Sequence, residues 1–269
     1  MIIFKSINTL VKEVNFKANI GFVPTMGSLH KGHVSLINTC KKKCKKTIVS
    51  IFVNPSQFNN KNDYKNYPRN IHNDLLILKR LKVDYVLIPS INDMFKTKKE
   101  MKIPILNKYK VLCAKFRPGH FEGVLGIINK FLKKIRSKYI FLGEKDFQQA
   151  YLIKNFIKRK FKTKVYICET VRSKYELPFS SRNVRLNKED LLKASKVSQA
   201  IKKLFFLIKK NFKNKDKITE IKKFIKSNNI NLQYLEIRNK NNLSSNFNQN
   251  NFKIFVAFFI KKIRLIDNV

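Results

Sequence analysis

Apolar and polar residues alternate between two patterns over the first 170 residues of the chain. Short apolar, mainly β-branched runs predict buried strands at Ile20–Val23, Thr47–Val53, Tyr85–Ile88, Tyr139–Leu142 and Val165–Cys168. Apolar residues recur at helical spacing over residues 33–45, 70–81, 121–136 and 146–160. Because strands alternate with helices, we expect a Rossmann-like α/β domain with a doubly wound parallel sheet, and ligands at the carboxyl ends of its strands.

The pattern changes near residue 174. Helix-like stretches at 188–211 and 217–227 precede strand-like runs at Leu232–Arg238 and Ile254–Ile260, which an Asn-rich loop separates. The segment TVRSKYELPFSSRN has no clear period and suits a hinge. We therefore expect a first domain over residues 1–174 and a smaller C-terminal α+β domain over residues 175–269.

Polar segments follow three of the predicted strands of the first domain. PTMG follows the first strand, VNPSQF the second and GEKD the fourth. Because the carboxyl ends of parallel strands share one edge of a sheet, these segments are expected to form one ligand site.

The segment PTMGSLHKGH, residues 24–33, holds two of the 4 His and two of the 7 Gly in the chain. It reads as a strand end, a glycine-containing turn and a helix N-terminus. Unpaired backbone N–H groups at a helix start bind anions, and Gly27 and Gly32 allow a ligand to approach the backbone. His30 and His33 are close enough in sequence to reach the same ligand. This segment therefore predicts a phosphate site.

Composition adds a strong positive charge. The 269 residues contain 58 Lys and Arg against 17 Asp and Glu, a formal net charge of +41, as in many nucleic-acid-binding proteins. The Lys residues are spread over nearly every predicted helix, and they are enriched together with Asn, Ile and Phe, residues encoded by A- and T-rich codons. We therefore attribute the charge to a base-biased genome, a hypothesis that ordinary base composition of the coding sequence would refute, and expect no specific nucleic-acid partner.

Cysteine usage and hydropathy bear on the compartment. The 4 Cys, at positions 40, 44, 113 and 168, include no CxxC pair and predict reduced thiols. The first 16 residues lack the apolar core and cleavage site of a signal peptide. The longest apolar run, Ile254–Ile260, is far shorter than the roughly 20 residues that a membrane-spanning helix needs. A cytoplasmic protein without a membrane partner is expected.

HKGH at 30–33 resembles the H-x-G-H signature of nucleotidyltransferases and class I aminoacyl-tRNA synthetases. These enzymes pair it with a mobile basic loop that contains Ser. Ser180, Ser181 and Arg182 could supply hydroxyl donors and a guanidinium to the same triphosphate. Together the two segments favour ATP-dependent adenylyl transfer.

Further segments resemble one family, pantothenate synthetase. They are SIFVNPSQF at 50–58, YPRN at 67–70, RPGHFEGV at 117–124, LGEKDFQQ at 142–149, SSRN at 180–183 and RLIDN at 264–268. The resemblance implies ATP-dependent condensation of pantoate with β-alanine. Pantoate would attack the α-phosphate of ATP to give pantoyl adenylate and pyrophosphate, and the β-alanine amine would then displace AMP. It also implies a homodimer formed through the first domain.

The resemblance assigns roles by position. It implies that the catalytic residues are His33, as proton donor, with His30, Lys145 and Arg182. It implies that Gln57 and Gln149 bind pantoate, and that Gln57 also contacts β-alanine. The other pocket residues are Asn54, Tyr67, Arg117 and His120. The ATP-binding residues are Pro24, Thr25, Met26, Gly27, His30, His33, Gly143, Lys145, Asp146, Val171, Phe179, Ser180, Ser181 and Arg182.

Some of these positions have a second interpretation. Asp146 either caps the next helix or binds a ribose hydroxyl, and Arg117 and His120 either line the adenylate pocket or anchor a loop. ATP chemistry implies Mg²⁺, for which Asp74 is the candidate ligand, although the preceding position, often acidic in the family, is Asn73 here.

One departure from the family lies in the predicted hinge. The family usually has an Asp-Gly turn, a small residue and Met before Ser-Ser-Arg, whereas this chain has YELPF at 175–179. If the family's Gly has a positive φ, Glu176 in that conformation costs about 1 to 2 kcal/mol, or the loop relaxes into another one.

Two alternatives remain at the level of sequence. Another nucleotidyltransferase, such as a cytidylyltransferase, would explain HKGH but neither the pair Gln57 and Gln149 nor RPGHF. A basic nucleic-acid-binding protein that has lost catalysis would bind in a salt-sensitive way without ATP chemistry. The intact PTMG and GEKDFQQ segments argue against the second alternative.

Overall fold

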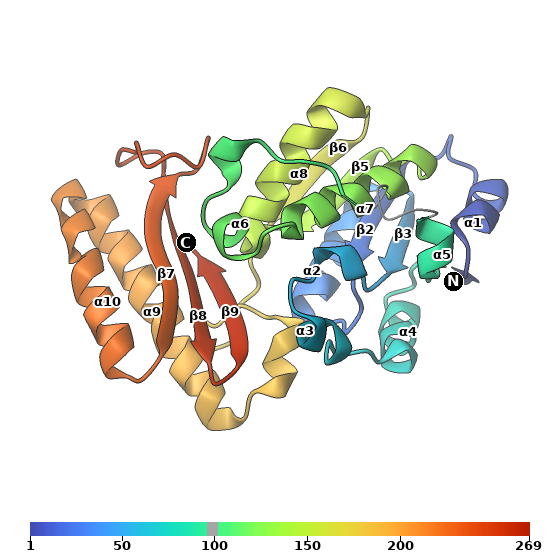
Figure 1. Ribbon diagram of the computed structural model, residues 1–269. Helices are drawn as coiled ribbons and strands as arrows, with labels where there is room; N and C mark the ends of the chain where they lie inside the picture. The colour runs from blue at the N-terminus through green and yellow to red at the C-terminus, as the bar shows by residue number, and fades with distance from the viewer. Residues whose placement is uncertain (96–101) are drawn as a thin grey trace. The chain divides into compact units, whose positions relative to one another are not determined.

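The computed structural model describes residues 1–95 and 102–269, which form two compact units (Figure 1). The first unit contains Met1–Asn107 and Phe116–Glu169, and the second contains Lys108–Lys115 and Thr170–Val269. The division therefore falls at residues 169 and 170, slightly before the boundary expected at 174. A short segment from the middle of the chain also belongs to the second unit.

The first unit is built on a six-stranded parallel sheet in the order β1-β4-β3-β2-β5-β6. The predicted strands are confirmed, with small changes at their ends. Their bounds are β2 Ile20–Thr25, β3 Lys46–Ile51, β4 Tyr85–Leu87, β5 Tyr139–Gly143 and β6 Lys164–Cys168. The edge strand β1, Ile2–Phe4, was not predicted, because it has only three residues and two of them are exposed.

The predicted helices of this unit are also confirmed, as α2 Lys31–Lys43, α4 Ile71–Arg80, α7 His120–Lys134 and α8 Phe147–Lys160. Shorter helices accompany them. These are α1 Ile7–Glu13, α3 Lys61–Lys65, α5 Ile91–Met94, and the 3-10 turns η1 Pro55–Gln57 and η4 Glu144–Asp146. The 3-10 turn η3 Asn107–Tyr109 and the helix α6 Cys113–Phe116 lie mainly in the segment Lys108–Lys115, which belongs to the second unit. No described helix is long and apolar enough to cross a membrane.

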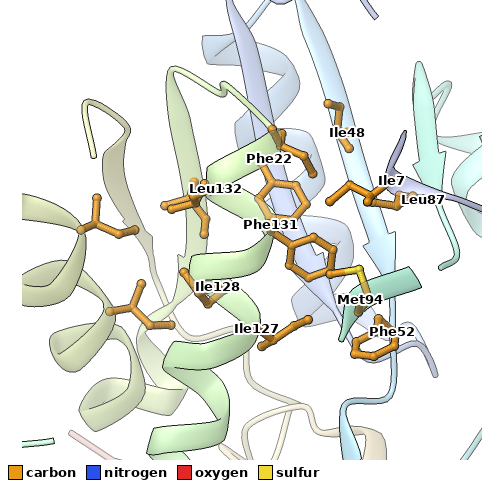
Figure 2. Packing of buried hydrophobic residues seen from close by; sticks show 14 of the residues in the cluster. Ile7, Phe22, Ile48, Phe52, Leu87, Met94, Ile127, Ile128, Phe131 and Leu132 are labelled. Carbon is orange, nitrogen blue, oxygen red and sulfur yellow. The ribbon is translucent and has the colours of Figure 1, made fainter. Parts of the chain in front are cut away.

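Successive residues of the central strands point into two different cores, as the period of a strand requires. Phe22, Ile48 and Leu87 pack with α1 and α7, whereas their neighbours in sequence pack with α2 and α4 on the opposite face. Figure 2 shows Phe131 of α7 beside Phe22, and their ring centroids are 5.2 Å apart. Because both faces of the sheet are covered, its strands are nearly continuous apolar runs, which explains why they could be predicted.

The main elements of the second unit are a three-stranded antiparallel sheet and two longer helices. The strands are β7 Asn231–Asn239, β8 Phe252–Ile260 and β9 Ile263–Asn268, in the order β7-β8-β9. The helices are α9 Lys188–Lys210 and α10 Ile218–Ser227, with the 3-10 turns η5 Ser181–Arg185 and η6 Phe212–Lys217. One apolar core joins the helices to the sheet. The α+β prediction is confirmed, but β9 was missed.

Candidate active site

Three polar loops meet at the carboxyl edge of the first unit's sheet. They follow β3, β2 and β5, which are adjacent strands. The strand order reverses at β2, because β3 and β4 extend to one side of it and β5 and β6 to the other. Open α/β sheets bind ligands at such a switch point. The fold therefore brings PTMG, VNPSQF and GEKD to one place, as the sequence predicted.

The loop after β2 makes an unusual turn. Gly27 and Ser28 both have positive φ angles, +77° and +51°. Thr25 secures the start of the turn, because its hydroxyl donates to the carbonyl of Ser50, 2.7 Å away, and accepts the N–H of Gly27 at 3.2 Å. Leu29 and the N-cap residue His30 then connect this turn to α2.

His30 and His33 cap helix α2. Nδ1 of His30 accepts the N–H of Gly32 at 3.1 Å, and Nδ1 of His33 accepts the N–H of His30 at 3.3 Å. A ring nitrogen that accepts a hydrogen bond carries no proton, so a neutral imidazole in either position carries its proton on Nε2. The capping box thereby makes Nε2–H the donor that each ring can offer to a ligand.

Both imidazoles are held in the neutral form. Burial, followed by the charge of Lys145, lowers the pKa of His30 to about 4, and Asp146 only partly opposes this. Burial, His30 and Lys145 lower the pKa of His33 well below its usual value of 6.5. At neutral pH both rings are therefore uncharged, and each can offer its Nε2–H as a hydrogen-bond donor.

Lys145 supplies the positive charge of this site. It lies in the η4 turn after β5, its side chain is 18% exposed, and its ammonium is 3.3 Å from the carboxylate of Asp146. Asp146 is also the N-cap residue of α8, but its side chain makes no capping hydrogen bond. Of the two interpretations of Asp146, this arrangement does not support helix capping by the side chain.

The loop after β3 holds Gln57 in place. The amide of buried Asn54 donates to Oε1 of Gln57 at 3.2 Å and to the carbonyl of Gly123 at 3.1 Å. Nε2 of Gln57 lies 2.9 Å from Sδ of Met26 in the loop after β2. Gln57 is buried, and these contacts join two of the three loops.

The side chains of Arg117 and His120 both contact the backbone carbonyl of Gln57. Nδ1 of His120 lies 2.6 Å from the carbonyl oxygen of Gln57, and Nη2 of Arg117 donates to that oxygen at 3.3 Å. Nη1 of Arg117 is 3.0 Å from Nε2 of His120. Because Arg can only donate and a carbonyl can only accept, His120 must carry its proton on Nδ1. The geometry thus gives RPGH a loop-anchoring role.

Asp74 lies beneath the turn after β2. It is 1% exposed, and its two carboxylate oxygens accept the N–H groups of Ser28 and Leu29 at 2.8 and 2.7 Å. Burial raises the pKa of this carboxyl, and the two N–H donors oppose the rise. Among the described residues, no group of three or more His, Cys, Asp or Glu side chains is arranged to hold a metal ion. The surroundings of Asp74 therefore do not fit the predicted Mg²⁺ ligand.

The remaining first-unit positions differ in their surroundings. Tyr67 is buried with its ring against Phe58, at a centroid distance of 5.5 Å. Gln149 is half-buried in the first turn of α8, beside the more deeply buried Gln148. Pro24 is half-buried at the end of β2, and Gly143 ends β5.

The other predicted ATP-binding residues belong to the second unit. The N–H of Phe179 donates to the carbonyl of Val171 at 3.1 Å, which closes a hairpin-like loop. Ser180 caps the η5 turn by accepting the N–H of Arg182 at 3.2 Å, and Ser181 is buried beside it. Val171, Phe179 and Ser180–Arg182 are thus brought together within their own unit.

A buried ion pair anchors this loop to β9. Arg172 contacts both carboxylate oxygens of Asp267 at 2.8 Å, and Asp267 is 3% exposed. Arg172 also donates to the carbonyl of Glu176 at 2.8 Å. Glu176 has a φ of +69°, so the turn keeps the left-handed conformation despite its side chain. Its carboxylate is 2.9 Å from the ammonium of Lys202.

Two residues that support the loops were not predicted from the sequence. Gly123 of α7 lies so close to the loop after β3 that a Cβ there would be 2.5 Å from the carbonyl oxygen of Ser56. Asp267 lies in the RLIDN segment, which resembles the family but to whose residues no role was assigned. A glycine inside an apolar helix pattern indicates close packing, so Gly123 could have been predicted. Nothing in the local sequence indicates the role of Asp267.

Comparison with known proteins agrees with this geometry. The family model described as Pantoate-beta-alanine ligase matches residues 3–269. The pantothenate synthetase of Francisella philomiragia is 41% identical over 273 residues, covering 100% of this chain and 97% of that protein. That of Francisella tularensis subsp. mediasiatica is 41% identical over 263 residues, covering 97% of this chain and 91% of that protein.

Solved structures give the same result. A pantoate-beta-alanine ligase from Francisella tularensis, in complex with Beta-gamma ATP and beta-alanine, has a TM-score of 0.87 and 38% identity, and the match covers 100% of this chain and 97% of that one. A pantothenate synthetase from Thermus thermophilus has a TM-score of 0.92 and 26% identity, covering 100% and 99%. On its sequence, its fold and the arrangement of its loops, this chain belongs to the pantoate-beta-alanine ligase family.

Proposed function

We propose that the chain joins pantoate to β-alanine in an ATP-dependent reaction that passes through pantoyl adenylate. One observation carries the proposal. Two neutral imidazoles, each with Nε2–H as its available donor, begin a helix at the carboxyl edge of the sheet, close to the ammonium of Lys145. Such a set of donors is suited to the negative charge of a triphosphate.

In the first half-reaction, a carboxylate oxygen of pantoate attacks the α-phosphorus of ATP. The bond from this phosphorus to the oxygen of the leaving pyrophosphate breaks, and its electron pair departs with pyrophosphate. His30 and His33 would donate hydrogen bonds to the charge that develops, and Lys145 would neutralise part of it. Because both imidazoles are neutral, they stabilise this charge without first having to gain a proton.

In the second half-reaction, the amine of β-alanine attacks the acyl carbon of the adenylate. The bond from that carbon to the AMP oxygen breaks, AMP leaves with the electron pair, and the amine proton passes to solvent. Gln57, with an amide held by Asn54 and a backbone held by Arg117 and His120, is our candidate for orienting the substrates. Gln149 is proposed to contact pantoate.

The second unit's loop, with Ser180, Ser181 and Arg182, is proposed to bind the phosphates as well. The bidentate ion pair between Arg172 and Asp267 supports this, because it secures the base of a loop whose tip would have to hold a fixed shape. Mg²⁺ would accompany ATP and reduce its charge, and no residue of this chain is assigned to it.

Assembly and compartment are part of the proposal. We expect a homodimer, as the resemblance implies. The four cysteines are free and buried, which suits a reducing compartment such as the cytoplasm.

The test is to incubate the protein with ATP, Mg²⁺ and pantoate, with and without β-alanine, and to follow pyrophosphate, AMP and pantothenate. We expect pyrophosphate to depend on pantoate, and AMP and pantothenate to depend on β-alanine. Absence of pyrophosphate from folded protein would refute the proposal and favour another nucleotidyltransferase substrate.

A matched pair of variants tests the imidazoles. His33→Ala should lower pyrophosphate release by about 10²- to 10³-fold, the usual cost of removing a donor to transition-state charge. His72→Ala removes an exposed histidine of α4 and is the control. Equal rates in the two variants would remove His33 from the reaction.

A further inference from the structure

Asp74 is a buried acid that the proposed reaction does not use. It lies in the first turn of α4 and reaches a loop more than 40 positions earlier in the sequence. Oδ2 accepts the N–H of Ser28 at 2.8 Å, and Oδ1 accepts the N–H of Leu29 at 2.7 Å. Each oxygen thus holds one backbone donor of the turn after β2.

That turn needs support from outside. Gly27 and Ser28 are both left-handed, a conformation that is unfavourable for Ser28 because its Cβ crowds the backbone. Strained turns persist where the surrounding structure holds them. A carboxylate that accepts two adjacent N–H groups is a strong holder, because charge-assisted hydrogen bonds are shorter and stronger than neutral ones.

The turn determines where the imidazoles lie. Leu29, which donates to Asp74, is followed directly by His30, the N-cap residue of α2. A shift of the Leu29 backbone would move His30 and, through the capping box, the ring of His33.

The carboxylate also has little free space around it. A Cβ built on Gly27 would lie 2.9 Å from Oδ2 of Asp74 and 3.1 Å from Cγ2 of Ile51. Mg²⁺ requires octahedral coordination and usually keeps several water molecules. Here each carboxylate oxygen already accepts a backbone N–H, and the backbone of Gly27 packs against Oδ2.

We propose that Asp74 is a positioning residue, which holds the ATP-binding segment Met26–His33 in shape through the N–H groups of Ser28 and Leu29, and that it is not a Mg²⁺ ligand. The inference rests on the proposed function only in that this segment binds ATP. Asp74 would affect the nucleotide through the loop, so its contribution does not require the metal.

Asp74→Asn tests this with little change in size. One oxygen is replaced by an NH2 group, which faces a backbone N–H and cannot accept from it. ATP binding is measured by calorimetry on the full chain without pantoate, once with Mg²⁺ and once with EDTA. We expect the dissociation constant to rise about tenfold under both conditions.

Asp84→Asn is the matched control. Asp84 also accepts a backbone N–H, that of Thr47 at 2.9 Å, together with the ammonium of Lys46 at 2.8 Å, but it does so at the opposite, amino-terminal edge of the sheet. It should lose stability without losing ATP affinity. Amide hydrogen exchange tests the same point without a ligand. In Asp74→Asn, the amides of Ser28 and Leu29 should exchange faster, whereas the amides within α2 should stay protected.

The outcomes separate the possibilities. Weaker binding with Mg²⁺ but unchanged binding with EDTA would make Asp74 a metal ligand and overturn the inference. Unchanged affinity in both buffers, or unchanged protection of the two amides, would overturn it as well. Failure of the unmodified chain to bind ATP would overturn the proposed function itself.

Discussion

The imidazole rings of His30 and His33 lie with their centroids 4.0 Å apart and their planes inclined by 35°. Two positive charges at this distance would repel each other strongly in a buried site. The rings therefore stay neutral together, and the N-terminus of α2 remains a set of hydrogen-bond donors over the physiological pH range.

Stability should consequently fall as the pH is lowered from 7.5 to 5.5. The folded pKa of His30 is about 4, below the unfolded value of 6.5, so the unfolded chain takes up a proton first. The contribution of the neutral histidines to the free energy of unfolding is complete above pH 6.5 and is lost as the pH falls towards 4. The free energy of unfolding should change by up to about 1.4 kcal/mol per pH unit for each histidine. Urea unfolding at several pH values measures this slope.

His30→Asn identifies the residue responsible. Asn is a good N-cap, so the start of α2 should be preserved while the titrating group is removed. The pH slope should decrease by the contribution of one proton. An unchanged slope would mean that His30 does not carry it, and His72→Asn, which alters an exposed histidine, is the control.

Gly123→Ala should destabilise the first unit by about 1 to 3 kcal/mol, the usual cost of overpacking. The added Cβ would lie 2.5 Å from the carbonyl oxygen and 2.6 Å from the carbonyl carbon of Ser56, both rigid backbone atoms. Because Asn54 donates to the carbonyl of Gly123, the Michaelis constant for the substrate at Gln57 should also rise.

Denaturant titration and steady-state kinetics measure both effects. Gly143→Ala is the stability control, since no heavy atom lies within 4 Å of a Cβ there and its φ is −81°. Equal stability losses in the two variants would contradict the steric explanation.

Glu176→Gly should stabilise the second unit by about 0.5 to 1 kcal/mol. The φ of +69° costs Glu about 1 to 2 kcal/mol, and Gly avoids this while losing additional conformational freedom on folding. The ion pair with Lys202 offsets little, because both side chains are more than a third exposed.

Thermal and urea unfolding measure the difference. Lys202→Met removes the ion pair without touching the turn and should change stability by less than about 0.5 kcal/mol. If Glu176→Gly is less stable than the unmodified chain, the strain of the left-handed backbone at Glu176 is smaller than the conformational freedom that Gly loses on folding.

Added NaCl should raise the urea midpoint of unfolding. With 58 cationic and 17 acidic side chains, most pairs of surface charges repel, and salt screens this repulsion over a Debye length of about 8 Å at physiological strength. Local pairs such as Lys46 with Asp84 weaken at the same time, but they are outnumbered. A midpoint that falls with salt would mean that local ion pairs dominate. An equal concentration of sucrose distinguishes screening from a general solute effect.

The parts of this fold that could be predicted are those with local causes. Strands such as β2 and β3 are buried on both faces and read as apolar runs, and the histidine pair is four residues of continuous sequence. β9 mixes buried and half-buried positions and carries Arg264 and Asp267, so its period is weak.

The missed features depend on distant contacts. Arg172 and Asp267 are 95 positions apart, and Asp74 is 45 from Leu29. The segment Lys108–Lys115 belongs to the second unit, where Sγ of Cys113 lies 3.1 Å from the hydroxyl of Tyr234, 121 positions away. No local pattern specifies such partners, because either side chain would be acceptable alone on a surface.

The turn at Glu176 also has an evolutionary consequence. Glycine and glutamate codons differ by a single G-to-A change, the direction in which an A- and T-rich genome drifts. A carboxylate that arises by this route lies on a surface with many lysines, and here it forms an ion pair with Lys202 of α9. If a base-biased genome accounts for both changes, the excess of lysines gives such a carboxylate a nearby partner, but a pair this exposed offsets little of the cost of the left-handed backbone.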